Sequence, residues 1–353
     1  MSIEQKSRAM TFPRIGKYII IFFAIAFIIV GARGYQLYRY VFNVNVNSDY
    51  VLMIDEGDNL KTISEKLQND QVLLNFKAFK WVAKKKKYAD YIRPGRYEIE
   101  KGMTTNQLVN MLRSGAQAPV NITFNNVRFK EELAGKVSKY IKADSLSILQ
   151  LFSDEQQITD WGFTSENFRA MFIPNTYEMY WTTSATEFAE RMKIEYDRFW
   201  NDTRSKQAAK MELTPQQVVT LASIVQSETI KPDELKTVAG LYVNRLRKNI
   251  ALQADPTVKY ALGDYSIKRV LNKHLEIDSP YNTYKFAGLP PGPICFPEIT
   301  SIDAVLNYEE HNYVYMCAKE DFSGYHNFAR TLSQHNRNAK KYRDALNERK
   351  IFK

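Results

Sequence analysis

A glutamate occupies a position in this chain where the sequence pattern favours an apolar residue. The segment 215–228 carries apolar residues at positions i, i+3, i+4 and i+7, namely Val218, Leu221, Ala222 and Val225. This spacing predicts the buried face of a helix, and Glu228 is the next residue on that face. Burial and the negative end of the helix dipole both disfavour a carboxylate, so we expect a raised pKa for Glu228. A carboxyl group that keeps its proton near neutral pH is suited to general acid catalysis.

The alternative for Glu228 is a helix-end carboxylate that faces solvent or pairs with a lysine. The helix itself is well signalled, because Thr214 is a typical N-cap, Pro215 fits the first helical position and Gln217 completes a capping box. A second helix is predicted from Pro232 to about residue 247, with a buried face formed by Leu235, Val238, Ala239, Tyr242 and Leu246.

Polar residues after this second helix are candidates for contact with a sugar. Asp255 precedes a proline, which predicts a turn or the N-cap of a short helix, and Gln253 is a candidate sugar contact. Two irregular segments follow, Tyr281-Asn282-Thr283-Tyr284 and 288–294, which includes Pro290. They are dense in turn residues, aromatics and amides, so they suit a saccharide cleft and equally a rigid structural loop.

The histidines and cysteines do not form a metal-binding pattern. His326 and His335 lie within ten residues of each other, but Asp or Cys partners at ligand spacing are missing, so we expect hydrogen-bonded histidines and no metal or cofactor. Cys295 and Cys317 belong to no CxxC motif. A disulfide between them stays open, and two buried free thiols are the favoured state.

The N-terminal region predicts a membrane anchor. Residues Tyr18–Ala32 are apolar or small, and an aromatic extension reaches residue 40. The basic residues Lys6, Arg8, Arg14 and Lys17 precede this run, and no small-x-small cleavage pattern follows it. We therefore expect a signal anchor over residues 18–40, with residues 1–17 in the cytoplasm and the body of the chain on the extracytoplasmic side of the cytoplasmic membrane.

The predicted extracytoplasmic location narrows the classes of partner that the net charge of the chain allows. The formal net charge of +10 indicates an anionic partner, which by charge alone is nucleic acid, anionic lipid or an acidic wall polymer. A chain that lies outside the cytoplasm excludes nucleic acid as the natural partner.

The rest of the chain predicts an α+β fold in two parts. After a polar linker at 41–49, a strand, a Gly turn and an amphipathic helix occur near 50–67 and again near 96–112, with a third copy from Val120 to about Ile141. We predict a LysM-like β/α subdomain over 50–117, which such β-loop-α units resemble, and a mixed helix-rich catalytic domain with a small sheet over 118–353. Residues 174–177 indicate a turn before a helix at about 184–200.

Several motifs in order resemble one known family. The motifs are Leu221-Ala222-Ser223-Ile224-Val225-x-x-Glu228-Thr229, Asn244-Arg245-Leu246, Leu252-Gln253-x-Asp255-Pro256-Thr257-Val258, Tyr281 to Tyr284, Gly288 to Ile294, His326-x-Phe328 and His335-Asn336. Together they are similar to the endolytic peptidoglycan transglycosylase MltG (YceG-like) family. The resemblance implies a lytic transglycosylase that cuts the β-1,4 bond between N-acetylmuramic acid and N-acetylglucosamine in nascent strands. It leaves 1,6-anhydro-N-acetylmuramic acid ends and terminates glycan elongation.

The resemblance also implies roles for individual residues. Glu228 is the catalytic residue, and the substrate-binding residues are Gln253, Asp255, Tyr281, Asn282, Thr283, Tyr284, Pro290, His326, Phe328, His335 and Asn336. One carboxyl group suffices if the C6 hydroxyl of the substrate is the nucleophile, whereas a hydrolase of this bond normally needs two acids. The expected partners are peptidoglycan strands, membrane lipid around the anchor and, as an open point, cell-wall synthases.

Three residues depart from the family pattern. Gln226 stands where relatives often carry an acid, Asn175 where an aspartate is expected and Cys295 where a small residue is usual. Two alternatives remain from the sequence: a muramidase-type hydrolase that uses Glu228 with Asp255, and a non-catalytic membrane-anchored scaffold of the cell wall.

Overall fold

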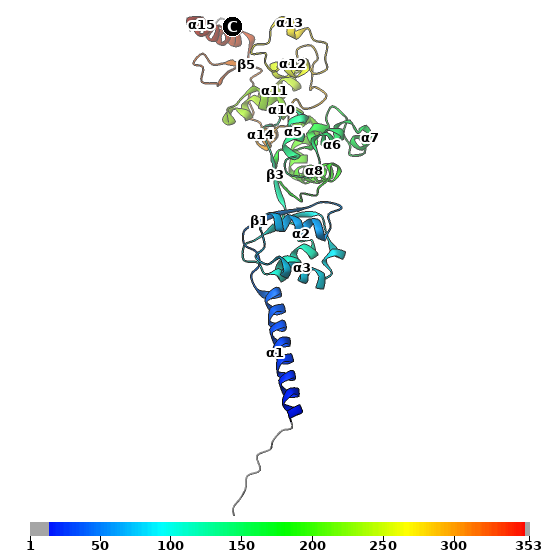
Figure 1. Cartoon of the computed structure of the whole chain (residues 1–353). Helices are drawn as coiled ribbons and strands as arrows, with labels where there is room; N and C mark the ends of the chain where they lie inside the picture. Colours follow the sequence, from blue (N-terminus) through cyan, green and yellow to red (C-terminus); the bar gives the residue numbers. More distant parts are fainter. Residues whose placement is uncertain (1–13, 350–353) are drawn as a thin grey trace, which may run out of the picture. The chain divides into compact units, whose positions relative to one another are not determined.

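The computed structural model describes residues 14–349, and the chain divides into two compact units, Met1–Pro119 and Val120–Lys353. The expectations for Lys6 and Arg8 lie outside the described residues. The fold is mixed α and β, and within residues 14–349 the strands pair in three antiparallel two-stranded sheets. Figure 1 labels one strand of each sheet, β1, β3 and β5.

The first unit contains one long helix and a small α/β body. Its elements are α1 (Arg14–Phe42), β1 (Tyr50–Ile54), α2 (Leu60–Asn69), α3 (Phe76–Lys85), the 3-10 helix η1 (Tyr88–Tyr91), β2 (Gly95–Ile99) and α4 (Thr105–Ser114).

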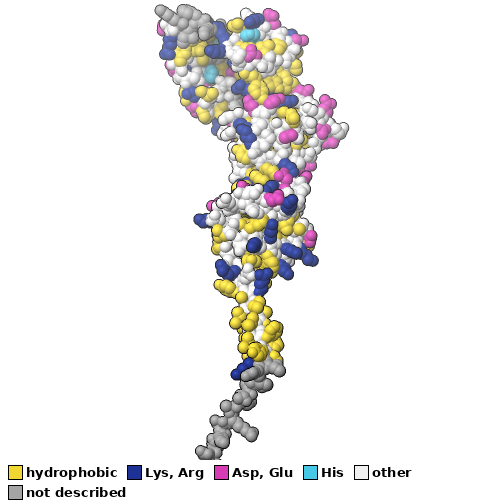
Figure 2. Space-filling view, in the orientation of Figure 1, with side chains coloured by type: hydrophobic (Ala, Val, Ile, Leu, Met, Phe, Trp, Pro, Cys, Tyr) yellow, Lys and Arg dark blue, Asp and Glu magenta, His cyan; other side chains and the backbone are white. Residues whose placement is uncertain are grey.

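Helix α1 is long and apolar enough to cross a membrane. The candidate span is Gly16–Phe42, with a mean hydropathy of 2.1 in its most apolar window, and none of that window is buried inside the protein. Figure 2 shows hydrophobic side chains over the surface of this helix. At about 1.5 Å per residue, the 29-residue helix extends beyond the roughly 30 Å hydrocarbon core of a bilayer.

The body of the first unit is a single core formed around one sheet. Strands β1 and β2 pair antiparallel from Tyr50↔Ile99 to Ile54↔Gly95, so the two predicted strand-helix units share one sheet. The apolar faces of the helices close over it, with Ile63, Leu67 and Leu112 fully buried. The predicted strands and helices here are therefore confirmed, and the structure adds that the two strand-helix units share one core.

Residues that we expected to lie in the polar linker 41–49 are partly built into this core. Val44 forms an isolated bridge with Thr104, and Val46 forms one with Leu73. Val46 and Asn45 are buried. The chain therefore passes from the end of α1 directly into the edge of the α/β body.

The second unit is rich in helices. Its elements are β3 (Val120–Phe124), α5 (Lys130–Val137), α6 (Ser145–Gln150), η2 (Leu151–Ser153), α7 (Glu155–Asp160), η3 (Phe168–Met171), β4 (Asn175–Met179), α8 (Ala185–Phe199), α9 (Asp202–Lys210), α10 (Pro215–Glu228), η4 (Pro232–Glu234), α11 (Leu235–Arg247), α12 (Asp255–Leu262), α13 (Asn272–Leu275), α14 (Ile299–Leu306), β5 (Tyr315–Ala318), β6 (His326–Ala329) and α15 (Leu332–Glu348).

Two expectations in the first part of this unit need correction. Asn175–Met179 is strand β4, which pairs with β3 from Val120↔Met179 to Phe124↔Asn175, so the predicted turn at 174–177 is wrong. The third strand-helix copy ends early, because α5 stops at Val137 and Ile141 is buried outside the helix. Local turn residues were outweighed by pairing with a distant strand.

Helix α10 is the centre of the second unit. It begins as predicted, with Thr214 as N-cap, Pro215 at the first helical position and Gln217 in a reciprocal capping box. All residues from Val218 to Val225 are buried, so the helix is enclosed on every side and is not amphipathic as the predicted stripe implied. Helices α11, α12 and α14 pack against it.

Helix α11 approaches the segment 307–313 closely at a glycine. A Cβ on Gly240 would lie 2.3 Å from the backbone oxygen of Glu309 and 2.8 Å from Nε2 of His311. Polar bonds hold the same contact, since Glu309 N donates to Lys236 O (3.0 Å) and Asn244 Nδ2 donates to His311 O (2.7 Å). This close approach holds the segment before β5 against α11.

We predict that Gly240→Ala lowers the free energy of unfolding of the second unit by about 1–3 kcal/mol, because the backbone of Glu309 must move. Thermal unfolding of the purified chain measures the effect. The matched control is Gly135→Ala in α5, where nothing lies within 4 Å of the added Cβ. That control should be neutral or stabilising by about 0.5–1 kcal/mol, and equal losses from both variants would contradict the packing argument.

Candidate active site

A cavity of about 270 Å³ opens at the C-terminal end of α10. Its walls come from α10, α11, the segment before α12, the loop at Tyr284 and the β5–β6 sheet. The lining residues are Glu228, Leu241, Tyr242, Arg245, Leu252, Gln253, Asp255, Tyr284, Met316, Cys317, Ala318 and His326.

Glu228 is the last residue of α10 and is only partly exposed. Burial raises its pKa to about 7, and the nearby Asp255 acts in the same direction, while the Tyr242 hydrogen bond, Lys259 and Arg245 act against it. The predicted rise in pKa is therefore confirmed in direction, and burial is its main cause. A carboxyl group with this pKa is populated in both protonation states near neutral pH.

A buried tyrosine orients the Glu228 carboxyl group. The hydroxyl of Tyr242, on α11, donates a hydrogen bond of 2.7 Å to Oε1 of Glu228. Burial raises the pKa of Tyr242 well above its usual value, so the tyrosine stays a donor. No hydrogen bond to Oε2 is found within residues 14–349, which leaves that oxygen for a substrate.

Arg245 lies one helical turn after Tyr242 and ties the walls of the cavity together. Its Nε donates to Val314 O (2.6 Å), next to β5, and its Nη1 donates to Leu252 O (2.8 Å). Nη1 also reaches the side-chain oxygen of Gln253 at 3.3 Å. Gln253 has a φ of 49°, a left-handed conformation that places this residue in the cavity wall.

Asp255 does not cap a helix, so that expectation is wrong. The N-cap of α12 is Ala254, and Asp255 is the first helical residue. Its Oδ1 accepts a hydrogen bond of 2.6 Å from the hydroxyl of Tyr284. Burial is the main cause that raises the pKa of Tyr284, and the Asp255 hydrogen bond adds to it.

His326 is held at the cavity by a buried glutamate. Glu234 accepts from the backbone nitrogen of His326 (2.8 Å) and lies 2.9 Å from its Nδ1. It also accepts from Thr229 Oγ1 at 3.2 Å, directly after Glu228 in the chain. When Nδ1 donates to this carboxylate, Nε2 of a neutral ring is a hydrogen-bond acceptor.

Of the residues predicted from the sequence, five line this cavity: Glu228, Gln253, Asp255, Tyr284 and His326. The remaining seven do not: Tyr281, Asn282, Thr283, Pro290, Phe328, His335 and Asn336. Asn282 and Thr283 are buried and bonded to the protein, since Asn282 Nδ2 donates to Leu275 O (2.8 Å) and Thr283 Oγ1 accepts from Ala254 N (3.0 Å).

The others of these seven pack elsewhere. Tyr281 contacts the ring of Tyr260, with 4.6 Å between centroids, and Pro290 is buried. Phe328 packs on Tyr313. His335 stacks on Tyr315 from α15, and burial lowers its pKa, whereas Asn336 is exposed on the same helix.

Two of the departures from the family pattern have structural roles. Gln226 Oε1 accepts from the backbone nitrogen of Glu298 (2.6 Å) and from Ser301 Oγ (3.0 Å), so this neutral amide covers the N-terminus of α14. Cys295 is buried, and burial raises the pKa of its thiol to about 11. Asn175 begins strand β4 and is exposed.

Both cysteines are free thiols, but the expectation that both are buried is wrong. Cys317 is only half-buried and lines the cavity from β5. Within residues 14–349, no group of three or more His, Cys, Asp or Glu side chains is arranged to hold a metal ion.

Sequence reasoning missed two polar groups of the cavity, Tyr242 and Arg245. They lie three residues apart and thus on one face of α11, where the other buried residues are apolar. The argument that selected Glu228, a polar group on a stripe that should be apolar, applied to them as well. The contact of Tyr242 with Glu228 depends on how two helices pack, which no local spacing shows.

Comparison with known proteins gives a consistent result. Residues 52–341 match the YceG-like family. The chain is 29% identical to the endolytic murein transglycosylase of Bacillus subtilis, over 87% of this chain and 86% of the relative. It is 27% identical to the endolytic murein transglycosylase of Streptococcus pneumoniae (serotype 2, strain D39), covering 91% of this chain but 64% of the relative's length.

A solved structure agrees with the sequence relatives. The crystal structure of a putative yceG-like protein from Listeria monocytogenes superposes with a TM-score of 0.53 at 27% identity, over 82% of this chain and 98% of the other. The family match spans both units described above and includes every residue that lines the cavity. The chain therefore belongs to the YceG-like family.

Proposed function

We propose that the chain is an endolytic murein transglycosylase in which Glu228 is the catalytic residue. The observation that carries this proposal is a carboxyl group with a pKa of about 7 at the end of a buried helix, open to a cavity and held through one oxygen. The relatives in B. subtilis and S. pneumoniae bear the same activity in their names. The substrate is the β-1,4 bond between N-acetylmuramic acid and N-acetylglucosamine in nascent peptidoglycan.

The geometry suits one group that acts twice. Protonated Glu228 donates its proton from Oε2 to the glycosidic oxygen, while Tyr242 stays bonded to Oε1. The resulting carboxylate then accepts the proton of the C6 hydroxyl, whose oxygen attacks C1 and forms the 1,6-anhydro ring. The proton balance closes without water, because the proton that Glu228 gives up is replaced by the C6 hydroxyl proton.

Asp255 is the second acid that a muramidase-type hydrolase would need, since it lines the same cavity. One of its oxygens is occupied by the Tyr284 hydroxyl at 2.6 Å. We assign Asp255, Tyr284, Gln253 and His326 to the binding of sugar hydroxyl and amide groups, because these polar residues line one cavity from three different segments. The other residues implied by the resemblance would act on more distant sugars or through the loops that they hold.

The first unit completes the proposal. Helix α1 would anchor the chain in the cytoplasmic membrane, with its basic N-terminal flank inside the cell and the residues after α1 outside. Residues 50–117 would be a LysM-like subdomain, a type of module that holds N-acetylhexosamine glycans, and residues 118–353 the catalytic domain. The two helices α2 and α3 between paired strands β1 and β2 support this assignment.

We predict that Glu228→Gln reduces cleavage of glycan strands by at least about 100-fold, because an amide has the shape of the acid but no acidic proton. The assay is mass spectrometry of strands digested by the full chain, which counts 1,6-anhydro ends. The matched control is Glu131→Gln, at an exposed position of α5, which should leave the rate unchanged.

Four outcomes of this assay separate the hypotheses. Anhydro ends that require Glu228 support the transglycosylase. Reducing N-acetylmuramic acid ends, with equal losses in Glu228→Gln and Asp255→Asn, would establish a muramidase instead. A Glu228→Gln chain that cleaves as the wild type does would remove Glu228 from catalysis, and no cleavage by the wild type would leave only the scaffold.

Tyr242→Phe should move the alkaline limb of the pH profile of kcat/KM to higher pH. The reaction begins with protonated Glu228, so the rate falls as pH rises through its pKa of about 7. The Tyr242 hydrogen bond lowers that pKa, and its removal therefore raises it. Tyr284→Phe is the control, because that hydroxyl bonds Asp255 and should leave the limb in place. A limb that does not move in Tyr242→Phe contradicts the assignment of Glu228 as the titrating acid.

Glu228 should also make stability depend on pH. Its pKa is raised from 4.5 to about 7 by folding, so the folded state loses stability relative to the unfolded state as pH rises from 4.5 to 7. We expect Glu228→Gln to gain about 1–3 kcal/mol over the wild type between pH 4.5 and pH 8, measured by denaturant unfolding. Glu131→Gln should show no such gain. If the difference in free energy of unfolding between Glu228→Gln and the wild type does not change with pH, the carboxyl group of Glu228 is not desolvated.

A further inference from the structure

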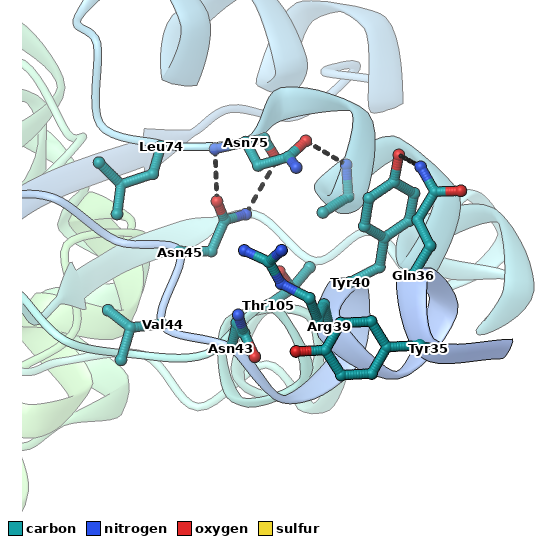
Figure 3. A pocket seen from close by; sticks show the side chains of 11 residues that line it. Tyr35, Gln36, Arg39, Tyr40, Asn43, Val44, Asn45, Leu74, Asn75 and Thr105 are labelled. Carbon is teal, nitrogen blue, oxygen red and sulfur yellow. Dashed lines mark hydrogen bonds between the residues drawn. The ribbon is translucent and has the colours of Figure 1, made fainter. Parts of the chain in front are cut away.

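The first unit contains a second cavity, of about 470 Å³, where the C-terminal part of α1 meets α3 and α4. Figure 3 shows its walls. The lining residues are Tyr35, Gln36, Arg39, Tyr40, Asn43, Val44, Asn45, Leu74, Asn75, Ala78 and Thr105. No acidic side chain is among them, so the cavity favours an anion over a cation.

A single guanidinium supplies the charge. Arg39 lies in the last turn of α1, and Figure 3 shows its guanidinium pointing into the space between Asn45 and Thr105. Among the residues that the structure describes, no acid forms an ion pair with Arg39, and its recorded side-chain contact is with the ring of Tyr35 at 6.0 Å. An unpaired arginine at a cavity is suited to bind phosphate or carboxylate through two parallel hydrogen bonds.

Two helix N-termini face the same cavity. Asn75 is the N-cap of α3 and Thr105 is the first residue of α4, and both helices are ten residues long. Side-chain caps bond the backbone N–H of Ala78 in α3 and of Gln107 in α4, and the first turn of each helix still carries the positive end of the helix dipole. Two such ends beside one arginine form an arrangement that attracts anions.

The hydroxyl of Thr105 is an independent sign of a missing partner. Thr105 is fully buried, and its Oγ1 makes no hydrogen bond within the described part of the chain. The other amides of the cavity wall are used differently, since Asn45 bonds both backbone groups of Asn75 (2.6 and 3.1 Å). A buried hydroxyl without a partner destabilises the fold, and a bound oxygen acceptor would offset that cost.

The position of the cavity along α1 identifies the source of the anion. Residues 18–32 are the apolar part of the candidate span, and the cavity begins at Tyr35, where the aromatic and basic residues of an interfacial belt start. A helix of this composition would place Arg39 at the level of the lipid headgroups. Apolar lining by Val44, Leu74 and Ala78 suits the glycerol and first acyl carbons that accompany a headgroup phosphate.

We propose that this cavity binds the phosphate of a membrane phospholipid headgroup, through Arg39, Thr105 and the N-termini of α3 and α4. The lipid would fix the body of the first unit against the membrane surface. This inference depends on the proposed anchoring by α1 and not on the transglycosylase activity.

The test uses the full chain in vesicles of phosphatidylglycerol and phosphatidylcholine, followed by native mass spectrometry of the phospholipid that the purified protein retains. We expect one retained phospholipid for the wild type, and about tenfold less for Arg39→Gln, because one charge-assisted pair is lost. Thr105→Val, which is nearly isosteric, should lower retention by a smaller factor. The matched control is Arg33→Gln, on the same helix but outside the cavity, which should retain lipid as the wild type does.

Two further measurements separate the possible sources of the phosphate and the possible failures. Inorganic phosphate in millimolar excess should not displace the lipid, and displacement would show that the site takes free phosphate and overturn the proposal. Equal retention by Arg39→Gln and Arg33→Gln would also overturn it.

Every variant should stay in the membrane fraction and produce anhydro ends at the wild-type rate. A wild type that leaves the membrane would overturn the anchoring and this site together, whereas absent cleavage would count against the enzyme alone.

Discussion

Burial of helix α10 is the constraint on which the second unit depends. Every residue from Val218 to Val225 is enclosed, so the helix cannot rotate or slide without exposing apolar surface to water. The position of Glu228 at its end is thereby fixed to within the tolerance of a packed core. The same enclosure removes water from the carboxyl group and raises its pKa to about 7. Burial of α10 therefore accounts for both the position and the raised pKa of Glu228.

Polar side chains on the neighbouring helix α11 fix the Glu228 carboxyl group and the walls of the cavity in place. Tyr242 and Arg245 are both buried on α11, and each is bonded to a group of the cavity wall. Arg245 bonds carbonyls of two segments far apart in the chain, at Leu252 and Val314, so one side chain joins the approach to α12 with strand β5. Burial lowers the pKa of this arginine, and its nearby tyrosines and Glu228 act in the opposite direction. A buried cation of this kind stabilises one arrangement of the loops because any other leaves its donors unbonded.

The first unit must join an exposed apolar helix to a packed α/β body. Helix α1 exposes apolar side chains, and the chain enters the α/β body within a few residues of its end. A headgroup bound between α1, α3 and α4 would stiffen this junction without a long linker. It would also keep the enzyme at the membrane surface, where nascent glycan strands are made.

The sequence by itself determined the elements whose signals are local. The start of α10 at Thr214 and Pro215, the strand at Tyr50–Ile54 and the raised pKa of Glu228 all follow from residues within a few positions of one another. The sequence also selected five residues that line one cavity, because their motifs stood in the order of a known family.

Only the tertiary structure decided contacts between distant segments. Asn175–Met179 is a strand because Val120–Phe124 pairs with it, which outweighs the local turn signal of Pro174 and Asn175. Gln226 covers the N-terminus of α14, 72 residues away, so the amide at that position has a structural partner that no neighbouring residue indicates. Tyr242, which donates a hydrogen bond to Glu228, also comes from a different helix, so this contact too depends on how the helices pack. A helix or cap is stabilised by residues within one or two turns, whereas strand pairing and side-chain partners depend on which surfaces the whole core brings together.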